Sequence, residues 1–273
     1  LHLSIRRQRQ MCIRDSYKNA LQLSEGIILV TGPTGSGKTT TLYSGLRHIS
    51  DTSQNILTVE DPIEYTLPGI GQTQVNNKAG YDFASGLRSI LRQDPDIVMV
   101  GEIRDIETAK IAIQASLTGH LVLSTIHTNS AIGAIARLRD MGIESYLLAS
   151  SLRVVIAQRL VRRLCEDCKT PVKPSATIQK EFQLEKNENI YQAVGCANCN
   201  HTGFKGRIAL AECINISDEL KALIHDEASE AKLAESAFKE NLSLDLSSSQ
   251  LLRDGLTSYE ELLRVQNHQD ANL

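Results

Sequence analysis

The sequence predicts an α/β fold built on a parallel sheet, because short apolar runs alternate along the chain with stretches of helical character. Four runs of strand length occupy residues 26–31, 55–60, 96–101 and 121–126. Each run is nearly continuous in its apolar character, as expected for strands covered on both faces. Strands that alternate with helices form a parallel sheet, so ligands are expected at the carboxyl ends of the strands.

The composition is that of a globular protein with a packed core. Of the 273 residues, 41% are hydrophobic and 22% are charged, and the net charge is -3. This charge, an aromatic content of 4% and the lack of Trp argue against nucleic-acid binding. No apolar run approaches the roughly 18 to 20 residues of a membrane span, and the polar start has no secretory signal. We therefore expect a cytoplasmic protein without a membrane anchor.

The first run leads directly into a phosphate-binding motif. Its pattern is a complete G-x-x-x-x-G-K-[ST], and an apolar helical stretch follows. In such a loop the glycines let backbone N–H groups surround a phosphate, the lysine adds a positive charge, and the last hydroxyl can bind Mg²⁺. The motif therefore predicts binding of ATP and Mg²⁺ by Gly32, Pro33, Thr34, Gly35, Ser36, Gly37, Lys38, Thr39 and Thr40.

Acidic residues follow the second and third runs. Glu60, Asp61 and Glu64 lie at the end of the second run, and Glu102 follows the third. Hydrolysis needs carboxylates that hold the metal ion and orient a water molecule, so Glu60 and Glu102 are candidate catalytic residues. Gly101 stands where an Asp often precedes the acid, so Glu102 would carry the magnesium role alone. Helix capping or solvation is the alternative for these acids, above all for Asp61 and Glu64.

The fourth run is bracketed by His120 and His127. An imidazole at a strand end can contact a γ-phosphate, although a lone histidine is more often a hydrogen-bonded structural residue. Before this run, Asp105 is expected to cap a helix that Gly119 ends. Apolar residues at helical spacing would form one face of that helix: Ile106, Ala109, Ile113 and Leu117.

Four of the six cysteines form two Cys-x-x-Cys pairs, a spacing that indicates a metal site in a reducing compartment. The pairs are Cys165 with Cys168 and Cys196 with Cys199. Four thiolates suit tetrahedral Zn²⁺ with no open position, hence a structural zinc. Four reduced, buried cysteines are the alternative. Cys213 lies in an apolar stretch and is expected in the core.

Together these motifs resemble the secretion-superfamily ATPases, the RecA-like hexameric motors of type II secretion and type IV pili. Four strings match, in order and in spacing, the Walker A, Asp, Walker B and His boxes of that family: GIILVTGPTGSGKTTTLYSGL, ILTVEDPIEY, LRSILRQDPDIVMVGEIRDIETA and TGHLVLSTIHTNSA. By this likeness Glu60 is the glutamate that polarises the attacking water, Glu102 is the Walker B acid and His127 is the His-box residue.

The cysteine segment narrows the resemblance to one part of the family. Four cysteines followed by GFKGR resemble the secretion and pilus-assembly branches, and YQAVGCANCNHTGFKGRIALAE is closer to type II secretion. The likeness implies an ATPase that powers pseudopilus assembly at the cytoplasmic face of the inner membrane. It would be a homo-hexamer when full length, with inner-membrane platform proteins as its partners and its link to the membrane. A type IV pilus extension ATPase is the alternative within the family, and a nucleic-acid translocase or zinc-ribbon protein is the alternative from another class.

The chain is expected to have four parts: a non-native tail at 1–16, the ATPase core at 17–160, a tetracysteine zinc module at 161–212 and a helical region at 213–273. The string LHLSIRRQRQMCIRDS matches nothing in the family and resembles translated adapter sequence. Members of the family carry an amino-terminal domain whose arginines reach the nucleotide. By that likeness the chain is truncated, and we expect it to be weakly active alone.

Overall fold

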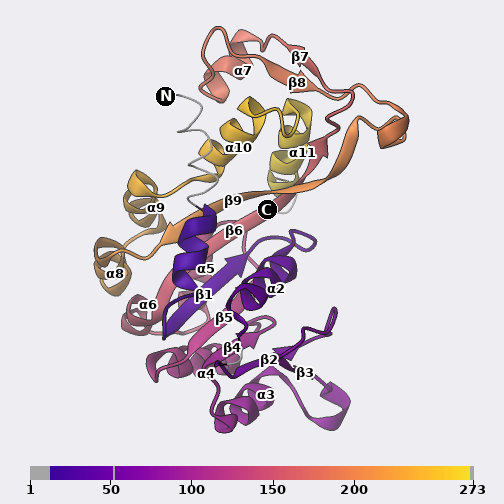
Figure 1. The fold of residues 1–273 in the computed structure, drawn as a ribbon. Helices are drawn as coiled ribbons and strands as arrows, with labels where there is room; N and C mark the ends of the chain where they lie inside the picture. Colours follow the sequence, from indigo (N-terminus) through magenta and orange to yellow (C-terminus); the bar gives the residue numbers. More distant parts are fainter. Residues whose placement is uncertain (1–12, 52, 271–273) are drawn as a thin grey trace.

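A seven-stranded sheet forms the centre of the protein in a computed structural model that describes residues 13–51 and 53–270 (Figure 1). The strand order is β3-β2-β4-β5-β1-β6-β9, and all neighbours pair in parallel except β6 with β9. The strands are β1 Gly26–Thr31, β2 Ile56–Glu60, β3 Gly71–Gln74, β4 Ile97–Val100, β5 Leu121–Ile126, β6 Leu152–Leu164 and β9 Phe204–Asn215. The predicted α/β class is therefore confirmed.

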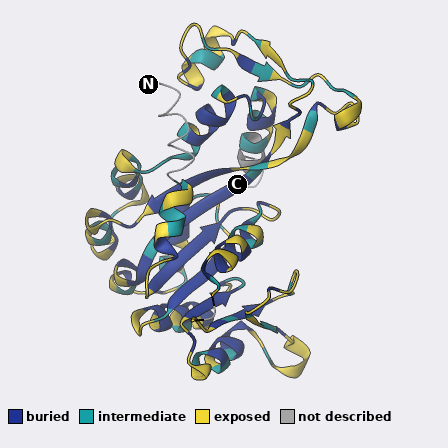
Figure 2. Ribbon diagram, viewed as in Figure 1, coloured by how far each residue is buried: buried dark blue, intermediate teal, exposed yellow. Residues whose placement is uncertain are grey.

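Both faces of the sheet are covered, which explains the continuous apolar runs. In β1, Ile27 and Leu29 belong to one hydrophobic cluster and Ile28 and Val30 to another, because successive side chains of a strand point to opposite faces. Figure 2 shows the central strands buried and the outer surfaces of the surrounding helices exposed. The helices of this part are α2 Lys38–Ile49, α3 Phe83–Ile90, α4 Ile106–Leu117, α5 Ala131–Asp140 and α6 Ser145–Ser151.

Helix α4 begins as the sequence predicts. The Asp105 carboxylate accepts the Thr108 N–H at 2.7 Å and caps the helix. Ala109 and Ile113 are buried, but Ile106 and Leu117 are 41% and 39% exposed. The predicted apolar face is therefore wrong at its two ends, because these residues lie in the terminal turns of the helix.

Strands β6 and β9 form a long antiparallel pair at one edge of the sheet (Figure 1). Cys165 directly follows β6, and Cys196 and Cys199 precede β9. Beyond them lie the three-residue strands β7 (Thr170–Val172) and β8 (Ile190–Gln192), with helix α7 (Ala176–Glu181) between. A separate hydrophobic cluster joins this region to the end of the chain, and its buried members include Val161, Phe182, Leu210, Leu251 and Leu262.

Four helices follow β9 in the described part of the chain, as expected for a helical region near its end: α8 Asp218–His225, α9 Glu230–Glu240, α10 Leu244–Arg253 and α11 Tyr259–Asp270. The buried Glu261 fastens α11 to β6 by accepting the backbone N–H and the Nε–H of Arg162 at 2.9 and 2.8 Å. Within α11 it also accepts an N–H of Arg264 at 2.7 Å. Burial raises the pKa of Glu261, but these bonds outweigh burial and lower it to about 2.

The predicted division of the chain stays a prediction. Its boundaries at 160/161 and 212/213 fall inside β6 and β9. Of the predicted tail, residues 1–12 lie outside the described residues, and residues 13–16 belong to a helix at 13–20. Within the described part of the chain, no helix is long and apolar enough to cross a membrane.

Candidate functional site

A cavity of about 640 Å³ lies at the carboxyl ends of β1, β2, β4 and β5. Of the residues predicted to bind the nucleotide, those from Thr34 to Thr40 line it, together with Glu60, Glu102 and His127. Gly32 and Pro33 lie outside its lining. Among the predicted residues, the structure thus brings together side chains that are as far as 93 positions apart, Thr34 and His127.

The loop after β1 presents its backbone to this cavity. Gly35 and Gly37 have φ values of 78° and 87°, which favour glycine. Gly37 immediately precedes α2, so the positive end of the helix dipole faces the same space. The buried Lys38 ammonium donates to the carbonyls of Gly32 and Pro33 at 2.9 and 3.1 Å. Burial lowers the pKa of Lys38, and the charge of Glu102 opposes that shift.

Glu60 at the end of β2 is only 2% exposed, and three side chains fix its carboxylate. The Tyr43 hydroxyl of α2 and the Thr58 hydroxyl donate to it, and Gln72 Nε2 of β3 donates at 3.0 Å. Burial and the bond to Glu60 raise the pKa of Tyr43, so this phenol stays a donor. A buried carboxylate held in this way is positioned to orient a water molecule in the cavity.

Glu102 stands between two cationic or titratable groups. It forms an ion pair with Arg104, and its Oε2 lies 3.4 Å from Nε2 of His127. Burial lowers the pKa of His127, and the charges of Lys38 and Arg104 add to this effect while Glu102 opposes it. The imidazole is therefore held toward its neutral form, which can accept as well as donate a hydrogen bond.

The fold gives a steric reason why glycine, and not the Asp that often occurs there, occupies position 101. A Cβ added there would lie 3.3 Å from the Val59 carbonyl oxygen and 3.4 Å from the Cα of Glu60. A larger side chain would press on the backbone that carries Glu60. The glycine thus lets β4 approach the end of β2 closely.

The remaining charged candidates differ in position. Asp61 and Glu64 line the cavity with exposed side chains, and Asp61 lies 3.9 Å from Arg104. His120 precedes β5 at the opposite end from His127, and its Nδ1 lies 3.0 Å from the Ala115 carbonyl oxygen. The two histidines therefore lie at opposite ends of β5, and of the two only His127 lines the cavity.

Sequence reasoning missed several residues of this site. Tyr43 and Gln72 hold Glu60, and Arg207 of β9 lines the cavity more than 160 positions after the phosphate-binding loop. Arg207 belongs to the GFKGR string, but nothing in that string indicates a position in the nucleotide cavity. Gln72 lies in a polar strand that has no apolar pattern. Only the tertiary fold brings these side chains to the cavity.

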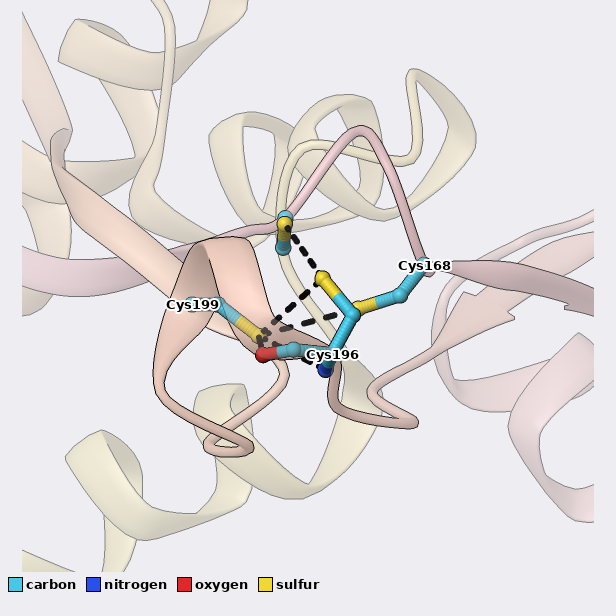
Figure 3. A group of neighbouring side chains, drawn as sticks. Cys168, Cys196 and Cys199 are labelled. Carbon is cyan, nitrogen blue, oxygen red and sulfur yellow. Dashed lines mark hydrogen bonds between the residues drawn. The ribbon is translucent and has the colours of Figure 1, made fainter.

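The four paired cysteines converge as predicted, with all their sulfur atoms within 4.8 Å of one another. Figure 3 shows the side chains of Cys168, Cys196 and Cys199 gathered at this point. The Cys165–Cys196 sulfur distance is 3.9 Å, and the Cys168–Cys199 distance is 3.8 Å. A tetrahedron with zinc–sulfur bonds of about 2.3 Å has edges of about 3.8 Å, so the four residues fit one Zn²⁺.

Backbone groups around the cluster favour a thiolate. Cys199 Sγ accepts N–H bonds from Cys196 and from Gly203, both at 3.2 Å. Burial raises the pKa of Cys199, but these bonds reverse the shift and lower the pKa to about 6. Donors to sulfur of this kind are the outer shell that orients metal-binding thiolates. Cys213 is buried in the core, as predicted.

Comparison of the sequence with known families and proteins gives consistent matches. The family model for type II/IV secretion system proteins matches residues 8–264. The type II secretion system ATPase E of Vibrio cholerae serotype O1 is 54% identical over 92% of this chain and 50% of its own length. The type II secretion system protein E of Aeromonas hydrophila is 52% identical over 92% of this chain and 51% of its own. The chain thus spans about half the length of these curated relatives.

Solved structures with the same fold include a pilus motor and a bacterial ATPase. The pilus retraction motor PilT with bound ADP superposes with a TM-score of 0.71 and 30% identity, over 92% of this chain and 64% of that one. The Legionella pneumophila ATPase DotB superposes with a TM-score of 0.68 at 24% identity, over 93% of this chain and 63% of that one. The DotB likeness supports the fold alone.

Proposed function

Since the chain belongs to the type II/IV secretion system protein family, we propose that its cavity binds and hydrolyses ATP to power type II protein secretion. The observation that carries this proposal is the convergence of the phosphate-binding loop, Glu60, Glu102 and His127 on one cavity. A loop of this kind without carboxylates would only bind phosphate, whereas here a fixed carboxylate lies beside it.

Each residue has a role that its surroundings support. The backbone N–H groups of residues 34–39 and the Lys38 ammonium bind the phosphates. The Thr39 hydroxyl and Glu102 would hold Mg²⁺, which neutralises phosphate charge when bound. Glu60 orients the water that attacks the γ-phosphorus, and ADP leaves as the bond to the γ-phosphoryl group breaks. His127, held toward its neutral form, contacts the γ-phosphate.

The wider setting of this activity belongs to the same proposal. Relatives that carry the name type II secretion system protein E favour pseudopilus assembly over type IV pilus extension. The motor would act as a hexamer at the cytoplasmic face of the inner membrane, through platform proteins of the secretion system. We further propose slow hydrolysis by these 273 residues alone, because they span about half the length of the curated relatives and the family likeness expects arginines of a further domain at the nucleotide.

The cysteine cluster is proposed to hold one structural Zn²⁺. The observation in support is the sulfur spacing, which matches a closed tetrahedral site. Four protein ligands leave no position for a substrate, so this metal would stabilise the fold and take no part in hydrolysis. The cluster would fasten the ends of β6 and β9 together.

Binding of Mg-ADP by isothermal titration calorimetry tests the nucleotide site. Lys38→Ala removes the charge that faces the phosphates and is expected to abolish measurable binding. Lys110→Ala, at an exposed position of α4, is the matched control and should bind as the unaltered chain does. Equal affinity in all three proteins would contradict the proposed nucleotide site.

A further inference from the structure

Strand β6 directs two neighbouring side chains to two different loops of the candidate site. Gln158 and Arg159 are buried, with exposed fractions of 5% each. Gln158 reaches the phosphate-binding loop, and Arg159 reaches the segment that follows His127. Successive residues of a strand point to opposite faces, so one strand contacts both loops at once.

The Gln158 side chain uses both ends of its amide on the phosphate-binding segment. Its Nε2 donates to the Ser36 carbonyl at 2.7 Å, and its Oε1 accepts the Thr41 hydroxyl at 2.7 Å. The backbone also lies close, because a Cβ added at Gly32 would stand 2.2 Å from the Gln158 carbonyl oxygen. The phosphate-binding loop therefore contacts β6 along its whole length, from Gly32 to Thr41 in the first turn of α2.

The bond to Ser36 sets the direction of a phosphate-binding group. In a planar trans peptide the C=O of one residue and the N–H of the next point in opposite directions. A Ser36 carbonyl held toward Gln158 therefore aims the Gly37 N–H away from β6. Gly37 lines the cavity, so this N–H belongs to the surface that would surround a phosphate.

Two buried ionisable side chains, Arg159 and Glu212, hold the second loop from the other face. Arg159 donates to the Asn129 carbonyl at 3.0 Å, and the Glu212 carboxylate of β9 accepts the Ala131 N–H at 2.6 Å. Glu212 is 4% exposed. From the β1 side, Thr31 accepts the Thr128 N–H at 2.9 Å. The residues directly after His127 are thus fixed by β1, β6 and β9.

We propose that Gln158 is a positioning residue for the phosphate-binding loop, and that Arg159 and Glu212 position the loop of His127. Strand β6 then sets both loops for the same bound nucleotide. This inference rests on the proposed ATPase function, because it assigns these residues to the nucleotide site rather than to the core in general.

The test compares two buried glutamines with respect to Mg-ADP binding and thermal stability. Gln158→Met keeps the size of the side chain and removes both hydrogen bonds, so Mg-ADP affinity is expected to fall about tenfold. Gln250→Met of α10 is the matched control, because Gln250 is also 5% exposed and bonds to Asp254 instead. It should alter the melting temperature but leave the affinity unchanged.

Two further variants keep the test decisive. If Gln158→Met does not fold, Thr41→Val removes only the hydroxyl bond to Oε1 and should weaken Mg-ADP binding severalfold. In Glu212→Met, the Ala131 N–H loses its acceptor, so its amide hydrogen is expected to exchange faster. The affinity for a non-hydrolysable Mg-ATP analogue should also fall severalfold, because the loop that follows His127 is then less well fixed.

The outcomes separate this inference from the function on which it rests. If the unaltered chain fails to bind Mg-ADP, the proposed function is wrong and this inference falls with it. If the unaltered chain binds and Gln158→Met, or Thr41→Val in its place, binds equally well, only the role of Gln158 is overturned. An unchanged affinity of Glu212→Met for the non-hydrolysable Mg-ATP analogue overturns the role of the Glu212 contact.

Discussion

The central sheet and the cysteine region of this protein are stabilised in different ways. In the sheet, strands such as β1 are buried along their whole length, and hydrophobic clusters cover both faces. Around the cysteines, β7 and β8 have only three residues each, and the third hydrophobic cluster has eight buried members. In this region the four paired cysteines converge between the end of β6 and the start of β9.

The difference shows where each region obtains its free energy of folding. Apolar burial contributes roughly 25 cal/mol per Å², so the sheet can fold on burial alone. Small units with little core usually depend on metals or disulfides. The sheet that positions the nucleotide site is therefore stabilised by apolar packing on both faces. The cysteine region is expected to need its proposed zinc for stability. The two regions should respond separately to changes in either site.

The largest expected effect is the loss of the cysteine region when one ligand is removed. Structural Zn²⁺ sites contribute on the order of 10 kcal/mol, so Cys196→Ser should unfold the region around residues 165–207. Hydrogen exchange at Gly195 and Gly203 should become fast, while amides of β1 and β5 remain protected. Metal analysis of the unaltered protein should give one zinc per chain. Cys213→Ser, which changes a buried cysteine outside the cluster, is the control and should keep its zinc.

The second effect concerns chemistry without a change in stability. Glu60→Gln keeps the shape of the side chain but loses the charge that orients water, so ATP turnover in a full-length background should fall by roughly 10² or more. Mg-ADP binding and zinc content should be unchanged. Phosphate release assays measure the rate, and Glu235→Gln on the exposed surface of α9 is the control. A Glu60→Gln variant with normal turnover would assign the water-orienting role to another group.

A third, smaller effect tests how Glu60 is held. Tyr43→Phe removes one of the three donors to the Glu60 carboxylate, so we expect turnover to fall about tenfold with unchanged Mg-ADP affinity. Tyr146→Phe, at a position that is 55% exposed, is the control. If Tyr43→Phe weakened nucleotide binding and left the rate constant for hydrolysis unchanged, the phenol would stabilise the position of α2 and not that of the Glu60 carboxylate.

The sequence predicted much of the sheet because its parallel strands are buried on both faces. The four predicted runs correspond to β1, β2, β4 and β5. The other strands of the sheet, β3, β6 and β9, were not predicted, and in β3 the string GQTQ has no apolar pattern. The cysteine cluster could be predicted because metal geometry requires the Cys-x-x-Cys spacing. The contacts of Gln158 and Tyr43 could not be predicted, since they depend on how distant elements pack.

The smallest expected effect is a pH dependence that belongs to the nucleotide site. Burial holds the pKa of His127 below its usual 6.5, with Lys38 and Arg104 adding to the shift, so the unfolded chain binds more protons than the folded chain below that pH. The contribution of His127 to stability is therefore present above pH 6.5 and is lost as the pH falls through the lowered pKa. The side chain is 51% exposed, so solvent screening keeps the effect small.

Melting temperatures measured over roughly pH 8 to 5 should fall less steeply for His127→Gln than for the unaltered chain. His225→Gln, on the exposed surface of α8, is the control and should retain the original slope. Equal slopes in all three proteins would show that burial and the charges of Lys38 and Arg104 do not hold the His127 imidazole toward its neutral form.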